Sequence, residues 1–370
     1  MIFNFQTTRV EHRFHNMAEK VRVLLVGSGG IGTMTALNLE QGGHAAVSAV
    51  LRSNYAAVKE KGFTIDSCDH GKLDGWRPAE ILNKVPDVAS DPSVMPFDYI
   101  ICTTKNIPDV PPVLVDIIRP AVTPGKSVIL LIQNGLNIEK PLHKEFPTNI
   151  VLSGVSFMGA DELSPGHVLE NDTDRLSVGP FFNPALDIEA QIAAAEHFVK
   201  IYSATGKVQC SYDRDVQFIR WRKLLYNAVW NPICAITGMD TTRLRLASEV
   251  DDPASPLNVL VRPAMNEVRA AAKAVADVEL PESLVEVMVD ADPLEIWCAP
   301  SMMQDTRKKR FIEYEYLVGE ALRAGEGAGV AMPTLRCIYG FCKAVQWRTK
   351  EYNGLVDPQK LMEERKKTQG

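Results

Sequence analysis

The stretch Val21-Arg-Val-Leu-Leu-Val-Gly-Ser-Gly-Gly-Ile-Gly32 decides the fold of the first half of this chain. Its first six residues are mostly apolar and rich in valine and leucine, which predicts a buried strand. The strand leads directly into a Gly-x-Gly-x-x-Gly turn, and a helical pattern follows from Thr33 to Glu40. A glycine triplet placed between a strand and a helix predicts a dinucleotide-binding site. The alternative is a glycine-rich turn without a ligand.

The glycines of this turn have separate roles. Gly27 permits the tight bend, Gly29 lets the backbone approach a pyrophosphate, and Gly32 lets the helix pack closely on the strand. The first N–H groups of the helix are unpaired and lie at the positive end of its dipole, so they attract phosphate. The residues expected to contact the cofactor here are Gly27, Ser28, Gly29, Gly30, Ile31 and Gly32.

Composition and charge limit the class of protein. The chain has 370 residues, which is more than one core usually holds and favours two domains. A net charge of −6 argues against nonspecific binding of nucleic acid. No window approaches the roughly 18 uninterrupted apolar residues of a membrane helix. The seven cysteines and seven histidines show no metal-ligand spacing, so we expect no metal centre and a reducing compartment such as the cytoplasm.

Further strands and helices continue the alternating pattern of the first half. Apolar segments predict strands at 45–51, 97–103, 127–132, 150–153 and 176–179, and a helix at 112–118. Strands that alternate with helices predict an α/β fold with a doubly wound parallel sheet of the Rossmann type. Residues 158–166 contain Gly, Asp and Pro, and we expect them to form a loop at the sheet edge where ligands bind.

Helical periodicity dominates the second half, and we expect no strand beyond residue 213. The expected helices cover 216–231, 257–277, 282–291, 301–325 and 334–351. We therefore predict a nucleotide-binding domain over 20–212 and an all-α domain over 213–358, with the chemistry in the cleft between them. Residues 1–19 are expected to form a disordered tail, with a mitochondrial presequence as the alternative, and 359–370 a charged and frayed one.

Arg52 lies twenty residues after Gly32, at the end of the second predicted strand. An acidic residue at this place would bind the ribose hydroxyl of NAD, whereas an arginine suits the 2′-phosphate of NADP. We therefore predict NADPH/NADP+ as the cofactor, with hydrogen bonds added by Ser53 and Asn54. Lys105 is a second cation near the same edge, although a single lysine there is more often a solvated one.

Four polar residues share one stripe of the predicted helix 216–231, because Arg220, Lys223, Asn227 and Asn231 are spaced at i, i+3, i+7 and i+11. Asparagine is only a middling helix former, so two in one helix suggest that their amides have partners. The alternative is an exposed polar face.

Two residues of the next helical pattern have simple structural explanations. Ser301 followed by Gln304 matches a capping box, which gives Ser301 a role at a helix start. Glu313 lies four residues after Lys309 and could pair with it on the helix surface. Spacing alone favours these structural roles.

At these residues the sequence resembles the ketopantoate reductase (2-dehydropantoate 2-reductase) family. The matching blocks, in order, are Gly27-Ser-Gly-Gly-Ile-Gly32, Gln133-Asn-Gly135, Lys223 with Asn227 and Asn231-Pro232, and Ser301-Met-Met-Gln-Asp305 with Glu313. The resemblance implies a Rossmann domain and an all-α domain similar to the C-terminal domain of 6-phosphogluconate dehydrogenase. It also implies reduction of 2-dehydropantoate to (R)-pantoate by NADPH, a step of pantothenate biosynthesis.

The resemblance implies a role for each matching residue. Lys223 would be the catalytic lysine that polarises the 2-oxo group and supplies the proton. Glu313, also catalytic, would lie against the lysine and the cofactor, and Asn134 would reach both cofactor and substrate. The remaining matches are the substrate-binding residues Asn227, Asn231 and Ser301 and the cofactor-binding residues Arg52, Lys105 and Gly159.

Some features depart from the family pattern. Segment 233–242 lacks an asparagine that some members use on the substrate, and inserts occur near 66–78 and 251–256. Trp230 and Trp297 add bulk near the expected site. The 2-oxo acid is therefore left open, and the alternatives are another branched 2-oxo acid, as in a D-2-hydroxyacid dehydrogenase, or a nucleotide-sensing protein without turnover. The sequence leaves a homodimer open.

Overall fold

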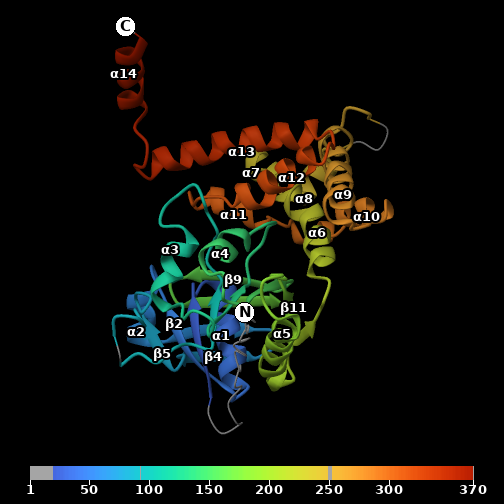
Figure 1. Ribbon diagram of the computed structural model, residues 1–370. Coiled ribbons are helices and arrows are strands. Elements are labelled where there is room, and N and C mark those ends of the chain that lie inside the picture. The colour runs from blue at the N-terminus through green and yellow to red at the C-terminus, as the bar shows by residue number, and fades with distance from the viewer. Residues whose placement is uncertain (1–19, 92, 249–251, 370) are drawn as a thin grey trace, which may run out of the picture. The chain divides into compact units, whose positions relative to one another are not determined.

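The computed structural model describes residues 20–91, 93–248 and 252–369 (Figure 1). The expected N-terminal tail, residues 1–19, lies outside these ranges. The chain divides into two compact units. The main boundary between them lies between residues 216 and 217, whereas the sequence predicts it between 212 and 213. Unit 1 contains the chain up to Val216 apart from two short segments. Unit 2 contains these segments, Asn106–Pro111 and Asn134–Asn137, together with everything from Gln217 onward.

Unit 1 is built on an eight-stranded sheet with the order β12-β11-β8-β7-β6-β1-β2-β5. Its strands are β1 (Val21–Val26), β2 (Ala45–Val50), β5 (Glu80–Leu82), β6 (Tyr99–Cys102), β7 (Val128–Leu131), β8 (Val151–Ser156), β11 (Arg175–Pro180) and β12 (Gln209–Tyr212). All neighbours are parallel except β8 and β11. The predicted doubly wound sheet is confirmed. Its one antiparallel pair arises because two further strands, and no crossover helix, connect β8 to β11.

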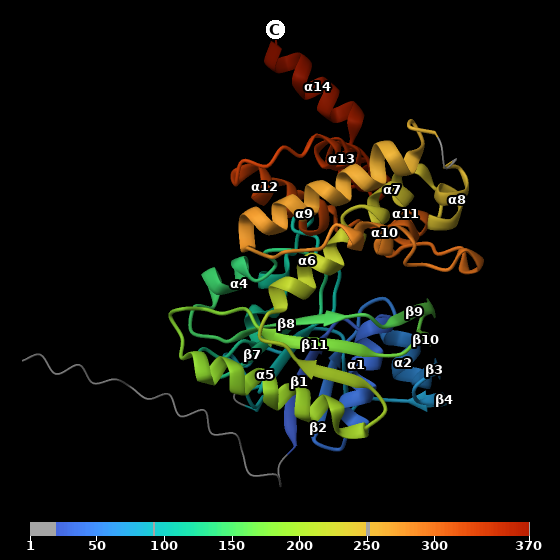
Figure 2. The ribbon, with the colours of Figure 1, turned by 90° about the vertical axis from the view of Figure 1, so that its right-hand side faces the viewer.

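Helices cover the large sheet and explain why its central strands are apolar throughout. β6 and β7 are buried along their whole length, as parallel strands between two helical layers should be. The helices of unit 1 are α1 (Gly30–Gln41), α2 (Tyr55–Lys61), α3 (Leu114–Ile118), α4 (Lys140–Glu145) and α5 (Ile188–Tyr202). α1 packs on β2, and α5 packs on β11, where Figure 2 shows the two elements side by side.

A second sheet of four strands differs from the sequence-based expectation. Its order is β4-β3-β10-β9, and its strands are β3 (Phe63–Ser67), β4 (Gly71–Trp76), β9 (Gly159–Ser164) and β10 (His167–Asp172). The prediction of a loop at 158–166 is therefore wrong. Pro165 and Gly166 form the turn between β9 and β10, where Gly166 has a φ of +81°, whereas Gly159 is the first residue of β9. α1 also packs on β9 and β10, so it contacts both sheets.

Unit 2 is helical, as the sequence predicts. Its helices are α6 (Val216–Asn227), α7 (Trp230–Thr237), α8 (Thr241–Leu246), α9 (Arg262–Ala276), α10 (Ser283–Val289), α11 (Ser301–Arg307), α12 (Glu320–Gly327), α13 (Pro333–Tyr352) and α14 (Pro358–Gln369). Short π-helical segments, Leu257–Val261 and Glu315–Gly319, lead directly into α9 and α12. α14 replaces the frayed tail that we expected. Among the described helices, none has the length and apolar character needed to cross a membrane.

Two of the predicted helices are each divided. The predicted helix 216–231 breaks at Ala228 and Val229, since Pro232 has no N–H to bond the carbonyl of Ala228 and is tolerated only in a first turn. The predicted helix 301–325 ends at Arg307. There Lys309 adopts a φ of +54°, and the N–H of the next residue bonds back across the turn, which closes the helix end.

The start of α1 offers a direct test of close packing. A Cβ atom on Gly32 would lie 1.9 Å from the backbone oxygen of Gly27, whereas a Cβ atom on Gly29 would have nothing within 4 Å. We expect Gly32→Ala to lower the free energy of unfolding by about 1–3 kcal/mol in denaturant titrations. The control, Gly29→Ala, should change it by less than about 0.5 kcal/mol. Equal losses in the two variants would contradict the close approach.

Candidate functional site

The glycine turn of unit 1 leaves one face of its backbone open. Gly27 has a φ of +101°, and a Cβ atom there would lie 2.8 Å from the backbone nitrogen of Thr104, so this position requires glycine. Gly29 precedes the first turn of α1 and faces open space. Open backbone beside unpaired helix N–H groups fits the pyrophosphate of a dinucleotide.

Strand β9 lies directly against this turn. A Cβ atom on Gly30 would lie 2.2 Å from the backbone oxygen of Ala160, the residue after Gly159. The buried Asn54 connects the turn to β9, because its Nδ2 donates to the backbone oxygen of Ser28 at 2.7 Å and to Oε1 of Glu162 at 2.8 Å. The Asn54 amide nitrogen is therefore used within the protein, which differs from our expectation that it would serve a cofactor phosphate.

The two predicted cations are exposed at the edge that carries the turn. β1 pairs in parallel register with β2 and β6, with Val26 opposite Val50 and Cys102. Residues that follow these three strands therefore meet at one edge of the sheet. Arg52 follows β2, Lys105 follows β6, and both side chains are exposed. The structure thus brings the glycine turn, both cations and the start of β9 together within unit 1.

In unit 2, α6 carries a lysine with an altered affinity for protons. Lys223 is half-buried, whereas Arg220 and Glu313 are each 5% exposed. Burial and the nearby Arg220 guanidinium lower the pKa of Lys223 to about 8, and the Glu313 carboxylate opposes them. A lysine amine with such a pKa can both hold and release a proton near neutral pH, which suits a general acid.

Glu313 is positioned by backbone and not by a surface lysine. It is buried in the non-helical segment between α11 and the π-helical turn, so the predicted pairing with Lys309 on a helix surface is wrong. Its Oε1 accepts a hydrogen bond from the backbone N–H of Asn106 at 2.9 Å. Asn106 belongs to the segment that follows β6 along the chain, and this contact fixes the carboxylate near Lys223.

The turn that carries Asn134 is also fixed within unit 2. Nη1 of Arg220 donates to the backbone oxygen of Gly135 at 2.9 Å, and the backbone N–H of Leu136 donates to the backbone oxygen of Tyr316 at 3.0 Å. Gly135 has a φ of +109°, and a Cβ atom there would lie 2.7 Å from Cβ of Tyr316. Only glycine fits this position, which explains the glycine of the Gln-Asn-Gly block.

Asn231 and Ser301 form a hydrogen-bonded pair, although neither is placed as the sequence predicts. Nδ2 of Asn231 donates to Oγ of Ser301 at 3.3 Å. Asn231 lies on α7 and so does not share a helix with Lys223 and Asn227. Ser301 is the first residue of α11 and its hydroxyl makes no cap, so the capping-box prediction is wrong. The hydroxyl is instead turned to Asn231.

The two tryptophans singled out in the sequence have structural roles. Trp230 is fully buried in the core of unit 2, and its Nε1 donates to the Met288 oxygen at 3.0 Å. Trp297 is 49% exposed, and the guanidinium of Arg243 lies 4.8 Å from its ring centroid. Packing of the helical core accounts for the bulk of Trp230.

The sequence pattern alone predicts no role for Arg220 or Asn106. The sequence does contain a pattern that could indicate the contact of Arg220, since this residue lies on the polar stripe of α6 one turn before Lys223. For Asn106 the only indication is that it belongs to the polar segment that follows a buried strand. Its contact is made by the backbone, and backbone donors leave no trace in the residue type.

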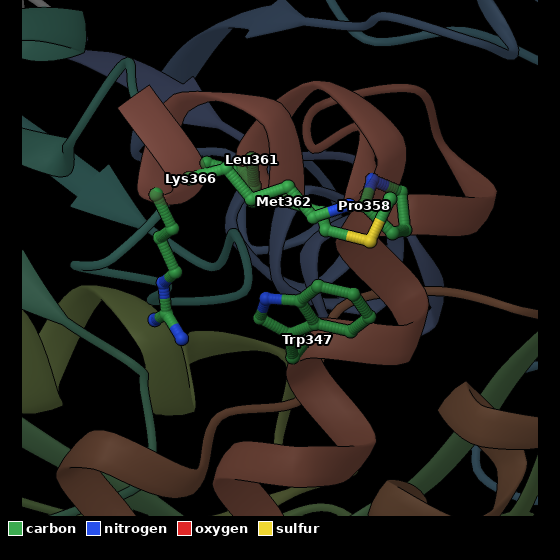
Figure 3. A pocket seen from close by; sticks show the side chains of 6 residues that line it. Trp347, Pro358, Leu361, Met362 and Lys366 are labelled. Carbon is green, nitrogen blue, oxygen red and sulfur yellow. The ribbon is translucent and has the colours of Figure 1, made fainter. Parts of the chain in front are cut away.

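A cavity of about 500 Å³ lies between α13 and α14 (Figure 3). Its lining is Trp347, Pro358, Leu361, Met362, Arg365 and Lys366. None of the predicted site residues contributes to this lining, so we do not assign the chemistry to it.

A glycine turn with cations at one sheet edge, together with a helical unit that holds a lysine of lowered pKa, is the arrangement of a dinucleotide-dependent oxidoreductase. The family model described as ketopantoate reductase PanE/ApbA matches residues 23–183, and its C-terminal counterpart matches residues 215–346. This chain belongs to the ketopantoate reductase family. It is therefore an oxidoreductase of that type, and its cofactor is a nicotinamide dinucleotide.

Individual relatives agree over nearly the full chain. Uncharacterized protein YDL144C of Saccharomyces cerevisiae is 37% identical over 349 residues, which cover 90% of this chain and 96% of the relative. The solved 2-dehydropantoate 2-reductase from Methylococcus capsulatus is 29% identical with a TM-score of 0.68, covering 89% and 98%. A ternary structure of D-mandelate dehydrogenase with NADH and anilino(oxo)acetate, 21% identical with a TM-score of 0.73, covers 89% and 100% and shares the fold.

The charges around Lys223 can be tested without an activity assay. We expect the Lys223 ammonium to titrate near pH 8 by NMR of the reductively ¹³C-methylated protein. Arg220→Gln removes a repelling positive charge and should raise this pKa, whereas Glu313→Gln removes an attracting negative charge and should lower it. Shifts of the same sign in both variants would contradict the proposed electrostatics.

Proposed function

We propose that this protein reduces a small branched 2-oxo acid with NADPH, and that the substrate is 2-dehydropantoate, which yields (R)-pantoate. The observation that supports the proposal best is the half-buried Lys223, whose pKa is lowered to about 8 beside Glu313. Family membership gives the reaction type. The substrate and the role of each residue are our inference.

Lys223 is the proton donor of the proposed reaction. The nicotinamide, when bound, supplies the hydride that the carbonyl carbon receives. The ammonium of Lys223 donates a hydrogen bond to the 2-oxo oxygen and transfers its proton as negative charge develops there. Arg220 and burial make that transfer easier, because they destabilise the charged form of the lysine. Glu313 keeps enough opposing charge nearby for the amine to be recharged from solvent.

The asparagines and Ser301 are the proposed contacts to the rest of the substrate. Oγ of Ser301 accepts from Asn231, so its own O–H remains a donor that can bind a carboxylate. Asn227 lies one helical turn beyond Lys223 and can bind the hydroxyl of the branched acid. Asn134 is held by the Gly135 contact and would reach both substrate and cofactor. These groups recognise a short acid with a second polar group.

The cofactor contacts are proposed for the edge of the large sheet in unit 1. The backbone of the turn from Gly27 to Gly32 would hold the pyrophosphate, with Gly159 contributing through the adjoining start of β9. Arg52 would bind the 2′-phosphate and Lys105 would add a second positive charge. The cytoplasmic location stays a prediction, and a homodimer stays open.

Removal of the amine tests the proposed mechanism. We expect Lys223→Ala to lower turnover with 2-dehydropantoate by about 100-fold or more, because the proton donor is lost. The affinity for NADPH, measured by fluorescence, should stay nearly unchanged, as should the turnover of the control Lys360→Ala on α14. In the unsubstituted protein, turnover should fall as the pH rises through about 8, where Lys223 loses its proton. Unchanged turnover in Lys223→Ala would remove this residue from the mechanism.

A panel of 2-oxo acids in the same NADPH-oxidation assay tests the substrate. We expect the highest kcat/KM for 2-dehydropantoate, and a higher value for another branched 2-oxo acid would replace it as the substrate. Absence of turnover with every acid would favour a nucleotide-sensing protein.

Arg52 tests the choice between the two nicotinamide cofactors. A charge-assisted contact to the 2′-phosphate contributes about 2 kcal/mol, so Arg52→Ala should weaken NADPH binding roughly thirtyfold. NADH lacks that phosphate, and its dissociation constant should change little. Lys59→Ala, which removes an exposed cation from the neighbouring α2, should affect neither cofactor. Equal losses for NADPH and NADH in Arg52→Ala would defeat the assignment.

A further inference from the structure

The hairpin between β3 and β4 lies against the end of β10 in the small sheet of unit 1. The hairpin turn consists of residues 68–70, and β10 runs parallel to β3 with Glu170 opposite Ser67. The backbone N–H of Cys68 donates to the backbone oxygen of Glu170 at 3.1 Å. Two parts of the chain that are about a hundred residues apart are therefore held together at this turn.

Three potential metal ligands converge there. The sulfur of Cys68, a carboxylate oxygen of Asp69 and a carboxylate oxygen of Glu170 all lie within 4.8 Å of one another. Cys68 is exposed, Asp69 is half-buried and Glu170 is 2% exposed. The cluster thus reaches from solvent to a buried carboxylate.

The buried carboxylate is incompletely satisfied. Oε2 of Glu170 accepts a hydrogen bond from the Ser67 hydroxyl, whereas the buried Oε1 has no hydrogen-bond partner among the described residues. Burial, with Asp69 and Asp174 adding to it, raises the pKa of Glu170 to about 7. The surroundings therefore disfavour its negative charge. A buried carboxylate oxygen without a donor is rare in folded proteins and points to a partner such as an ion.

Asp174 extends the same negative region. It is fully buried, and its Oδ2 accepts hydrogen bonds from Asn38 of α1 at 2.7 Å and from Tyr202 at 2.5 Å. Its backbone N–H donates to Oδ2 of Asp69 at 2.8 Å, and its own Oδ1 has no partner in the described part of the chain. A cation beside Asp69 and Glu170 would offset the charge of all three carboxylates.

We propose that Cys68, Asp69 and Glu170 bind one zinc ion. A thiolate with carboxylates suits Zn²⁺, because Mg²⁺ and Ca²⁺ prefer oxygen ligands alone. Zinc lies about 2.0–2.3 Å from such ligands, so atoms that are already neighbours can reach one ion with small side-chain adjustments. The exposed cysteine gives the ion a path from solvent, and a water molecule would complete four-coordination. The ion would cross-link the β3–β4 turn to β10, in the sheet that packs on α1.

This site departs from the expectation of no metal centre. Residues 68, 69 and 170 form no sequence motif, because only the pairing of β3 with β10 brings the third ligand to the first two. The proposal does not involve Lys223 or the oxidoreductase reaction, so its outcome is independent of the proposed function.

Cobalt and zinc titrations of the full-length, chelator-treated protein test the site. We expect one equivalent of Co²⁺ to produce a thiolate-to-cobalt charge-transfer band, Zn²⁺ to abolish that band by displacement, and Zn²⁺ to raise the Tm. Cys68→Ser should lose the band and bind Zn²⁺ at least about 100-fold more weakly, and Glu170→Gln at least about tenfold more weakly. Cys337→Ser, which removes an exposed cysteine of α13, should behave like the unsubstituted protein.

Two results would overturn the proposal. The first is a charge-transfer band that is absent from the unsubstituted protein or that survives in Cys68→Ser. The second is a Glu170→Gln variant that unfolds at a higher temperature without added metal and keeps its affinity for Zn²⁺, which would identify a carboxylate that holds a proton and not a cation. Circular dichroism and NADPH binding show whether each variant is folded.

Discussion

The backbone contact between Gly27 and Gly32 is the constraint on which unit 1 depends. It allows α1 to leave β1 at close range, and α1 then packs on the large sheet and on β9 and β10 of the small one. The same geometry leaves Gly29 open and presses Gly30 against Ala160. A side chain at Gly30 or Gly32 would therefore disturb the packing of α1, whereas one at Gly29 would enter the space proposed for a cofactor phosphate.

In unit 2, interruptions of helices shape the cluster around Lys223. The break before Pro232 places Asn231 on α7, where it meets Ser301 and not the stripe of α6. The break after Arg307 leaves Glu313 outside any helix, and its carboxylate accepts a hydrogen bond from the backbone N–H of Asn106. An uninterrupted helix over 301–325 would have kept Glu313 on the surface of that helix. Pro232 and the left-handed Lys309 thus help to determine where these polar side chains lie.

Local signals made part of the fold and site predictable, and nonlocal pairing hid the rest. The β1–α1 unit could be predicted because strand, turn and helix are contiguous, and the family resemblance supplied the roles expected of Lys223 and Asn134. The small sheet escaped prediction because β3 and β10 pair across about a hundred residues and β9 is largely exposed. The contacts of Arg220 and Asn106 were hidden for the same reason, since each joins segments distant in sequence.

The chain passes between the two units five times, because Asn106–Pro111 and Asn134–Asn137 belong to unit 2. A recombinant fragment that began at Gln217 would lack the Asn106 N–H that bonds Glu313 and the Gly135 carbonyl that bonds Arg220. The units are consequently interlaced and cannot be exchanged as independent modules by gene fusion at a single junction. An exchange of the helical unit between relatives would have to carry Asn106–Pro111 and Asn134–Asn137 with it.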